Sequence, residues 1–270
     1  MASSGNLPLH PALRFFSAGV IVVLIVGAGL FIAPGLVKPR WPWAVTPFNA
    51  RFLGGFYIAE MVVMATLLFW NRWAPGRLVL WMAFVFTLVA SIASFLNLGY
   101  FDFARKSPWI WFAVYLVSVL ISGLFLAAAR APPAAPTMPV TAGVTAWMRV
   151  EGPLLALYGI ALLLLPLVAA RFWPWPIDRF HAQVYSAVFL SGAAGVILLS
   201  LGAAREEMLV LGLAETVVGV LSILGLVITD MALHRVTWSS PGTIAWVAIF
   251  IALAASGLHK LTASASRALI

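Results

Sequence analysis

The sequence predicts an all-α integral membrane protein of about eight transmembrane helices, arranged as two parallel-repeat four-helix halves (4+4). Three observations support this fold class: an apolar composition, eight long apolar runs and an internal repeat. Hydrophobic residues make up 63% of the chain and charged residues 9%, whereas a soluble domain is about half apolar and about a quarter charged. One core cannot hide so much apolar surface, so lipid must cover part of it. We therefore expect a multi-pass protein of the cytoplasmic membrane.

Each transmembrane helix needs about 20 mostly apolar residues. Eight runs have this length, and they cover residues 15–37, 51–70, 77–99, 108–129, 150–170, 181–202, 207–229 and 242–260. Each run should be helical, because the bilayer core offers no water to bond a free backbone group. The first run is longer than the apolar core of a secretory signal, and it belongs to the repeat. We therefore expect it to stay in the mature protein.

The fourth and fifth runs are separated by residues 131–146, which are rich in proline and alanine. This composition favours a flexible linker. The linker divides the chain into a first four-helix repeat, residues 1–130, and a second four-helix repeat, residues 147–270.

The two halves share a sequence repeat. The segment Trp41-Pro42-Trp43 recurs 132 residues later as Trp173-Pro174-Trp175, and at the same offset Pro34 matches Pro166. Further along, the offset becomes 128 residues. Each unit has four spans, an even number, so both copies enter the membrane in the same sense. The halves should then be related by a pseudo-two-fold axis along the membrane normal.

The Trp-Pro-Trp segments have two interpretations. Tryptophan is typical of the membrane–water interface, so Trp41, Trp43, Trp173 and Trp175 are predicted interfacial anchors. The alternative is a short surface element that caps a cavity, because polar residues follow each copy. These residues are Thr46 and Asn49 in the first half, and Asp178, Arg179 and His181 in the second.

The basic residues do not fix the orientation of the chain. The 16 Lys and Arg residues divide equally between the two sides of the predicted membrane, so the positive-inside rule gives no answer. They occur singly or in pairs at the ends of apolar runs and form no stripe, which argues against nucleic acid as a partner. The expected partners are the lipid bilayer and other membrane proteins.

Glu60 lies near the middle of the second run, with no basic residue three or four positions away. A charged side chain at mid-bilayer costs about 2.5–3.5 kcal/mol on insertion scales, so it usually faces a cavity or a partner. Glu60 is therefore a functional candidate. The alternative is a protonated glutamic acid that bonds a neighbouring helix as a packing contact. Its counterpart in the second half is Gly192.

Glu215 shares a helical face with Gly212, Gly219 and Ser222. The matching face of the third run carries small polar residues. Together the candidates form a polar seam of Glu60, Thr87, Ser91, Ser94, Asn97, Glu215 and Ser222. Such stripes face other helices rather than lipid, so we expect the third and seventh runs to line the centre between the halves. Ordinary small-residue packing is the alternative.

The sequence gives little support for a metal site, a cofactor or enzymatic activity. The chain has no cysteine, which excludes disulfides, iron–sulfur clusters and a cysteine nucleophile. His181 and His234 are weak metal candidates, because no close ligand spacing accompanies them. There is no P-loop, dinucleotide-binding or hydrolase motif. We expect no enzymatic activity, and the sequence indicates no cofactor.

Three functions remain open. The first, which the sequence narrowly favours, is a permease-like protein for a small solute or ion, with a midplane carboxylate. The second is a non-catalytic membrane subunit or scaffold of a larger complex, with a lipid-soluble ligand as an option. The third is a membrane enzyme or redox subunit that uses His181 and His234, and the missing motifs weigh against it.

Overall fold

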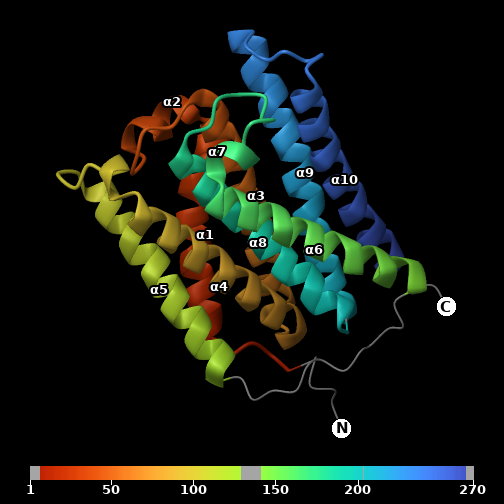
Figure 1. Ribbon diagram of the computed structural model, residues 1–270. Coiled ribbons are helices and arrows are strands. Elements are labelled where there is room, and N and C mark those ends of the chain that lie inside the picture. The colour runs from red at the N-terminus through yellow and green to blue at the C-terminus, as the bar shows by residue number, and fades with distance from the viewer. Residues whose placement is uncertain (1–6, 129–140, 203, 266–270) are drawn as a thin grey trace.

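The computed structural model describes residues 7–128, 141–202 and 204–265, which form a helical bundle without strands (Figure 1). Within these residues, eight helices are long and apolar enough to cross a membrane, which confirms the predicted membrane-helical fold class. They are α1 (Pro11–Ile32), α3 (Pro47–Trp70), α4 (Trp73–Leu96), α5 (Lys106–Ala128), α6 (Ala142–Leu164), α8 (Arg179–Ser200), α9 (Arg205–Leu233) and α10 (Pro241–Ala265). The short elements are α2 (Pro34–Val37), η2 (Lys38–Arg40), η3 (Leu98–Tyr100) and α7 (Pro166–Ala169).

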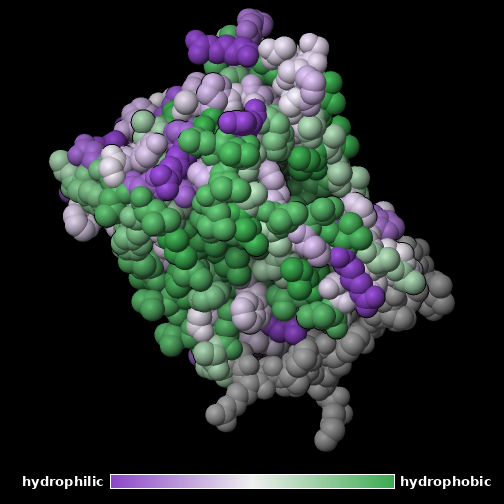
Figure 2. Space-filling model, viewed as in Figure 1, coloured by the Kyte–Doolittle hydropathy of each residue, from purple (hydrophilic) through white to green (hydrophobic). Residues whose placement is uncertain are grey.

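The surface of the bundle suits lipid. Large apolar side chains lie open on it, among them Phe15 and Phe69, which are 85% and 88% exposed. Figure 2 shows hydrophobic residues over the middle of the visible face, with hydrophilic residues toward its upper and lower ends. A soluble monomer rarely exposes apolar patches of this extent, so the bilayer must cover this belt.

Two spans end earlier than their apolar runs predict. α1 ends at Ile32 and α6 at Leu164. The next residues, Ala33 and Leu165, have φ/ψ of −134°/60° and −125°/51°, and each precedes a proline. Proline disfavours the α conformation in the residue before it. The chain therefore leaves the helix there and turns across the end of the bundle through α2 and α7.

The predicted linker of residues 131–146 extends too far at its C-terminal boundary, because it overlaps the start of α6. α6 already begins at Ala142, where the side chain of Thr141 accepts a hydrogen bond from the backbone N–H of Val144. A threonine at this position is a favourable helix N-cap. Residues 131–140 of the predicted linker lie outside the described residues.

The long helices form two layers of four. One layer has the order α1–α3–α9–α10, and the other has the order α5–α4–α8–α6. In Figure 1 the second layer lies in front of the first, and its helices run at an angle to those behind. Each layer therefore combines two helices from each half of the sequence.

Helix pairs in the first half have counterparts in the second. α1 packs on α3 as α6 packs on α8, and α4 packs on α5 as α9 packs on α10. Between the halves, α3 packs on α9 as α8 packs on α4. A duplicated four-helix unit would produce this pattern. The duplication itself stays a prediction, which a superposition of the two halves would test.

The Trp-Pro-Trp segments reach across to the opposite half. The buried indoles are those of Trp41, Trp43, Trp173 and Trp175, each at most 7% exposed. Trp43 Nε1 donates to His181 Nε2 at 3.1 Å, and Trp175 Nε1 donates to Asn49 Oδ1 at 2.7 Å. Asn49 and His181 are 132 residues apart and hold the same place in their helices. These indoles face protein, which differs from the lipid exposure expected of an interfacial anchor.

Candidate functional site

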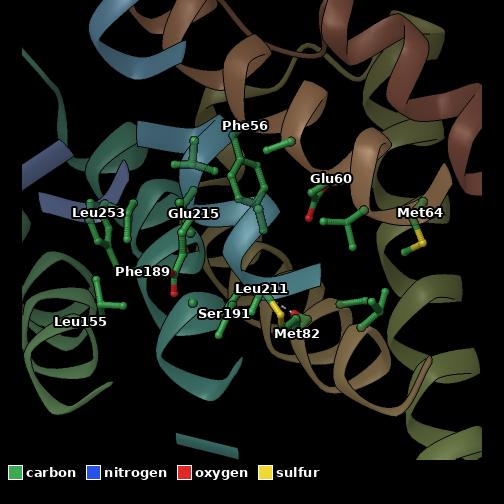
Figure 3. A pocket seen from close by; sticks show the side chains of 18 of the residues that line it. Phe56, Glu60, Met64, Met82, Leu155, Phe189, Ser191, Leu211, Glu215 and Leu253 are labelled. Carbon is green, nitrogen blue, oxygen red and sulfur yellow. Dashed lines mark hydrogen bonds between the residues drawn. The ribbon is translucent and has the colours of Figure 1, made fainter. Parts of the chain in front are cut away.

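A cavity lies between the two layers, lined by residues of α3, α4, α6, α8, α9 and α10 (Figure 3). About 80 Å³ of it is open to the centres of water molecules. Since about 10–15 Å³ by this measure holds one water, the cavity has room for a few waters or a small solute. Among the described residues that line it, only Glu60, Ser191 and Glu215 are polar.

The two glutamates enter this cavity from different helices. Glu60 lies ten residues before the end of α3, and Glu215 lies ten residues after the start of α9. Both counts start from one end of the bundle, where Arg72 and Glu206 form an ion pair at 2.8 Å. At 1.5 Å per residue, both carboxylates are about 15 Å from that end. Figure 3 shows Phe56 between them.

Glu215 belongs to a buried polar cluster. Lys260 Nζ donates to Glu151 Oε2 at 2.6 Å, to Ser256 Oγ at 2.8 Å and to Glu215 Oε2. An ammonium group has three hydrogens to donate, so all three are used. Trp147 Nε1 adds a hydrogen bond to Ser256 Oγ at 2.8 Å. The cluster joins α6, α9 and α10, and Lys260 is fully buried within it.

Glu151 and Lys260 are not among the site residues that the sequence predicts. Both lie at the ends of their apolar runs, where charged residues are usually interfacial. A signal was nevertheless present in the spacing. Trp147 and Glu151 are four residues apart, as are Ser256 and Lys260. Residues at this spacing share a helix face, so each helix carries a short polar stripe.

One oxygen of Glu215 is left without a partner. Its Oε1 atom is buried and has no hydrogen bond among the described residues, and the side chain borders the cavity. A buried acceptor without a donor costs free energy. With both carboxylates ionised, Glu151, Glu215 and Lys260 together carry one net negative charge. One proton or one bound cation would neutralise it.

Glu60 has even fewer contacts. No described residue donates a hydrogen bond to its carboxylate or forms an ion pair with it. It borders both the central cavity and a second cavity toward α1 and α5. The structure therefore places both predicted glutamates on one cavity system.

The glycines of α9 fit the second interpretation of the stripe, ordinary small-residue packing against another helix. A Cβ at Gly219 would lie 2.5 Å from the carbonyl oxygen of Phe250, and one at Gly212 would lie 2.8 Å from that of Gly257. These glycines therefore let α9 and α10 pack closely. α4 and α9 do line the cavity as predicted, but they do so largely through apolar residues.

The rest of the predicted polar seam lies away from the central cavity. These residues are Thr87, Ser91, Ser94, Asn97 and Ser222. Ser94 Oγ accepts a hydrogen bond from Trp111 Nε1 at 3.0 Å, and Asn97 Nδ2 donates to Gln183 Oε1 at 2.7 Å. These bonds tie α4 to α5 and to α8. Of the predicted seam, only Glu60 and Glu215 reach the central cavity, and Thr87 borders the second cavity.

The histidines are not brought together. His181 Nδ1 lies 2.7 Å from Asp178 Oδ2, while the exposed His234 ends α9 in a left-handed conformation with φ of 51°. In the described part of the chain, no group of three or more His, Asp or Glu could hold a metal ion. Burial opposes ionisation of Asp178, but its hydrogen bonds with His181 outweigh this and keep its pKa below the ordinary value.

Comparison of the chain with protein-family models, curated proteins and solved structures finds no match. A functional assignment therefore depends on the fold and on the cavity with its two glutamates.

Proposed function

We propose that the protein is a permease-like carrier that binds a small cationic solute in the central cavity, with Glu215 as the carboxylate that exchanges a proton for the cation. The observation that supports this proposal is the unpartnered Oε1 atom of Glu215 at the cavity wall, about 15 Å inside the bundle.

The charge of the cluster supports exchange. A net charge in an apolar environment is costly, so the site favours states in which it is neutralised. Lys260 already compensates one of the two carboxylates, Glu151 and Glu215. The remaining negative charge can hold one proton or one cation, but holding both would leave the cluster positive. Competition for one charge is the basis of exchange transport.

The wall of the cavity suggests the chemical class of the solute. Apart from the three polar residues, the described lining is apolar and includes Phe56, Phe189 and Phe250. Alkyl groups fit such a wall, and aromatic faces attract cations. The best match is a small ammonium ion with apolar substituents.

The test uses purified protein in liposomes that contain a pH-sensitive dye. Tetramethylammonium is added outside, because a quaternary ion cannot cross lipid as a neutral base. Exchange should raise the internal pH in parent liposomes but not in empty ones. Glu215→Gln, which can still accept a bond from Lys260, should lower this rate at least tenfold with little change in thermal stability.

Glu206→Gln is the matched control, because Glu206 lies outside the cavity and pairs with the half-exposed Arg72. This variant should exchange like the parent. The proposal fails if the parent shows no proton movement with tetramethylammonium or its ethyl homologues. It also fails if Glu215→Gln exchanges at the parent rate.

A non-catalytic membrane subunit or scaffold is the second candidate. The observation that favours it is the complete use of the Lys260 hydrogens within the protein, which suits a purely interhelical contact. This function predicts no exchange in the parent, and it predicts a loss of stability as the main effect of changing the cluster.

A further inference from the structure

The central cavity continues sideways toward the surface. A second cavity shares Glu60, Met64 and Ala83 with it. A third space, a groove between α1 and α5, shares five residues with the second cavity, among them Phe16 and Ser118. The groove has a volume of about 520 Å³. The three spaces trace a path from the lipid-facing edge of the bundle to Glu60.

The packing of the helices explains why this edge is open. α1 packs on α3 in one layer, and α5 packs on α4 in the other. Gly19 borders the groove without a side chain, and a Cβ added there would meet nothing within 4 Å. Phe15, at the outer rim, is 85% exposed. The groove therefore opens directly toward the acyl chains of the bilayer.

The inner end of the path has a different chemistry. Glu60 lies there without a basic partner among the described residues. Around it, the second cavity is lined by the aromatic rings of Phe16, Tyr57, Phe86 and Tyr115. A carboxylate among aromatic faces is complementary to a cation, whereas the outer groove is complementary to an alkyl chain.

We infer that the α1–α5 groove is a lateral entry site for a membrane-dissolved amphiphile with one alkyl chain and a small cationic head. The chain lies between α1 and α5, and the head reaches Glu60. This inference deepens the proposed function by naming the substrate class and its route, and its onward passage to Glu215 rests on that function. Binding at the groove does not require transport.

The test is photolabelling of the purified protein in lipid nanodiscs with dodecylammonium that carries a diazirine on its chain. Two probes with the same chain, an alcohol and a carboxylate, serve as controls for charge. The ammonium probe should label peptides of α1 and α5 at least fivefold more than either control. Glu60→Gln should remove this preference and leave labelling by the alcohol unchanged.

Two tryptophan variants of α1 test the location. Gly19→Trp fills the groove and should reduce ammonium labelling at least fivefold. Val22→Trp is its matched control, because Val22 is on the same helix and 64% exposed but does not line the groove, so labelling should stay at the parent level. Thermal unfolding of each variant checks that the fold is retained.

Equal labelling by ammonium and alcohol, or an ammonium preference that survives Glu60→Gln, would overturn the inference, because the groove would then hold any acyl chain. Labelling outside α1 and α5 would overturn it as well. Since labelling needs no gradient, it can succeed while exchange in liposomes fails. In that case the proposed carrier function is wrong and the amphiphile site stands.

Discussion

The two edges at which the layers of the bundle meet differ in chemistry. At one edge, α6 and α10 are joined by hydrogen bonds of Trp147 to Ser256 and of Lys260 to Glu151. At the other edge, α1 and α5 border the open apolar groove. The first edge is closed by a buried ion pair, and the second is left to lipid or to a ligand.

The predicted repeat would make these two edges counterparts. The 132-residue offset relates α6 to α1. For α10 and α5, Trp246 packs on Trp175 as Trp111 packs on Trp43, with ring centres 5.4 Å and 4.6 Å apart. At the 132-residue offset, Trp147 and Glu151 of α6 correspond to Phe15 and Gly19 of α1. Counted from the matching Trp246 and Trp111, Ser256 and Lys260 of α10 correspond to Ile121 and Phe125 of α5. All four of these first-half residues line the groove.

The two edges therefore differ in the side chains at these positions. Where Glu151 and Lys260 meet, Gly19 and Phe125 leave a space. A buried ion pair is weak evidence for added stability, because desolvation offsets much of the attraction. The pair nevertheless identifies the helix faces that meet here, those of α6, α9 and α10. A bundle with one joined edge and one open edge can admit a ligand while the packing of its other helices is retained.

The largest effect should come from breaking the closed edge. Lys260→Met leaves two buried carboxylates, Glu151 and Glu215, without their cation. Removing one partner of a buried ion pair costs about 3–5 kcal/mol, so the unfolding midpoint in detergent should fall by many degrees. Lys106→Met, at an exposed position that starts α5, should change it little.

A triple variant sharpens this result. Adding Glu151→Met and Glu215→Gln to Lys260→Met removes the unpaired charges, and apolar replacement of a whole buried ion cluster is often neutral. Most of the lost stability should return. If the triple variant is no more stable than Lys260→Met, the loss comes from packing and the closed edge does not depend on its charges.

The two edges should also differ in mobility. The chain has no cysteine, so cysteine pairs for spin labels can be introduced directly. Ile25 with Leu116 spans the open edge, and Leu157 with Ile251 is the counterpart pair at the closed edge. All four side chains are at least 40% exposed. The α1–α5 pair should give the broader distance distribution by pulsed electron resonance, and equal widths would contradict the comparison.

Hydropathy could predict the helices, because each span must be apolar over its length. Glu60 and Glu215 could be predicted as site residues because each interrupts an apolar run. The contacts of Glu215 could not, since a single helix does not reveal which neighbour its face meets, and Lys260 is 45 residues away. Trp43 and Trp175 follow the interfacial rule in composition, but their partners in the opposite half bury them.

The smallest effect concerns the start of the second long helix in each half. Asp178 caps α8 there, and Thr46 caps α3. Hydrogen bonds with His181 keep the pKa of Asp178 below its ordinary value of 3.8. Folding therefore favours the ionised form. The stabilisation is fully present above pH 3.8 and is lost as pH falls through the lowered pKa.

Unfolding midpoints measured from pH 6 down to pH 3 should therefore decline less steeply in Asp178→Asn than in the parent. Asparagine keeps the N-cap but cannot titrate. Asp102→Asn, at an exposed position outside the helices, should follow the parent curve. Because Asp178 is half-exposed, solvent screens its interactions, and the difference should be no more than a few degrees. Parallel curves for Asp178→Asn and the parent would show that the first-half cap and the second-half cap respond alike to acid.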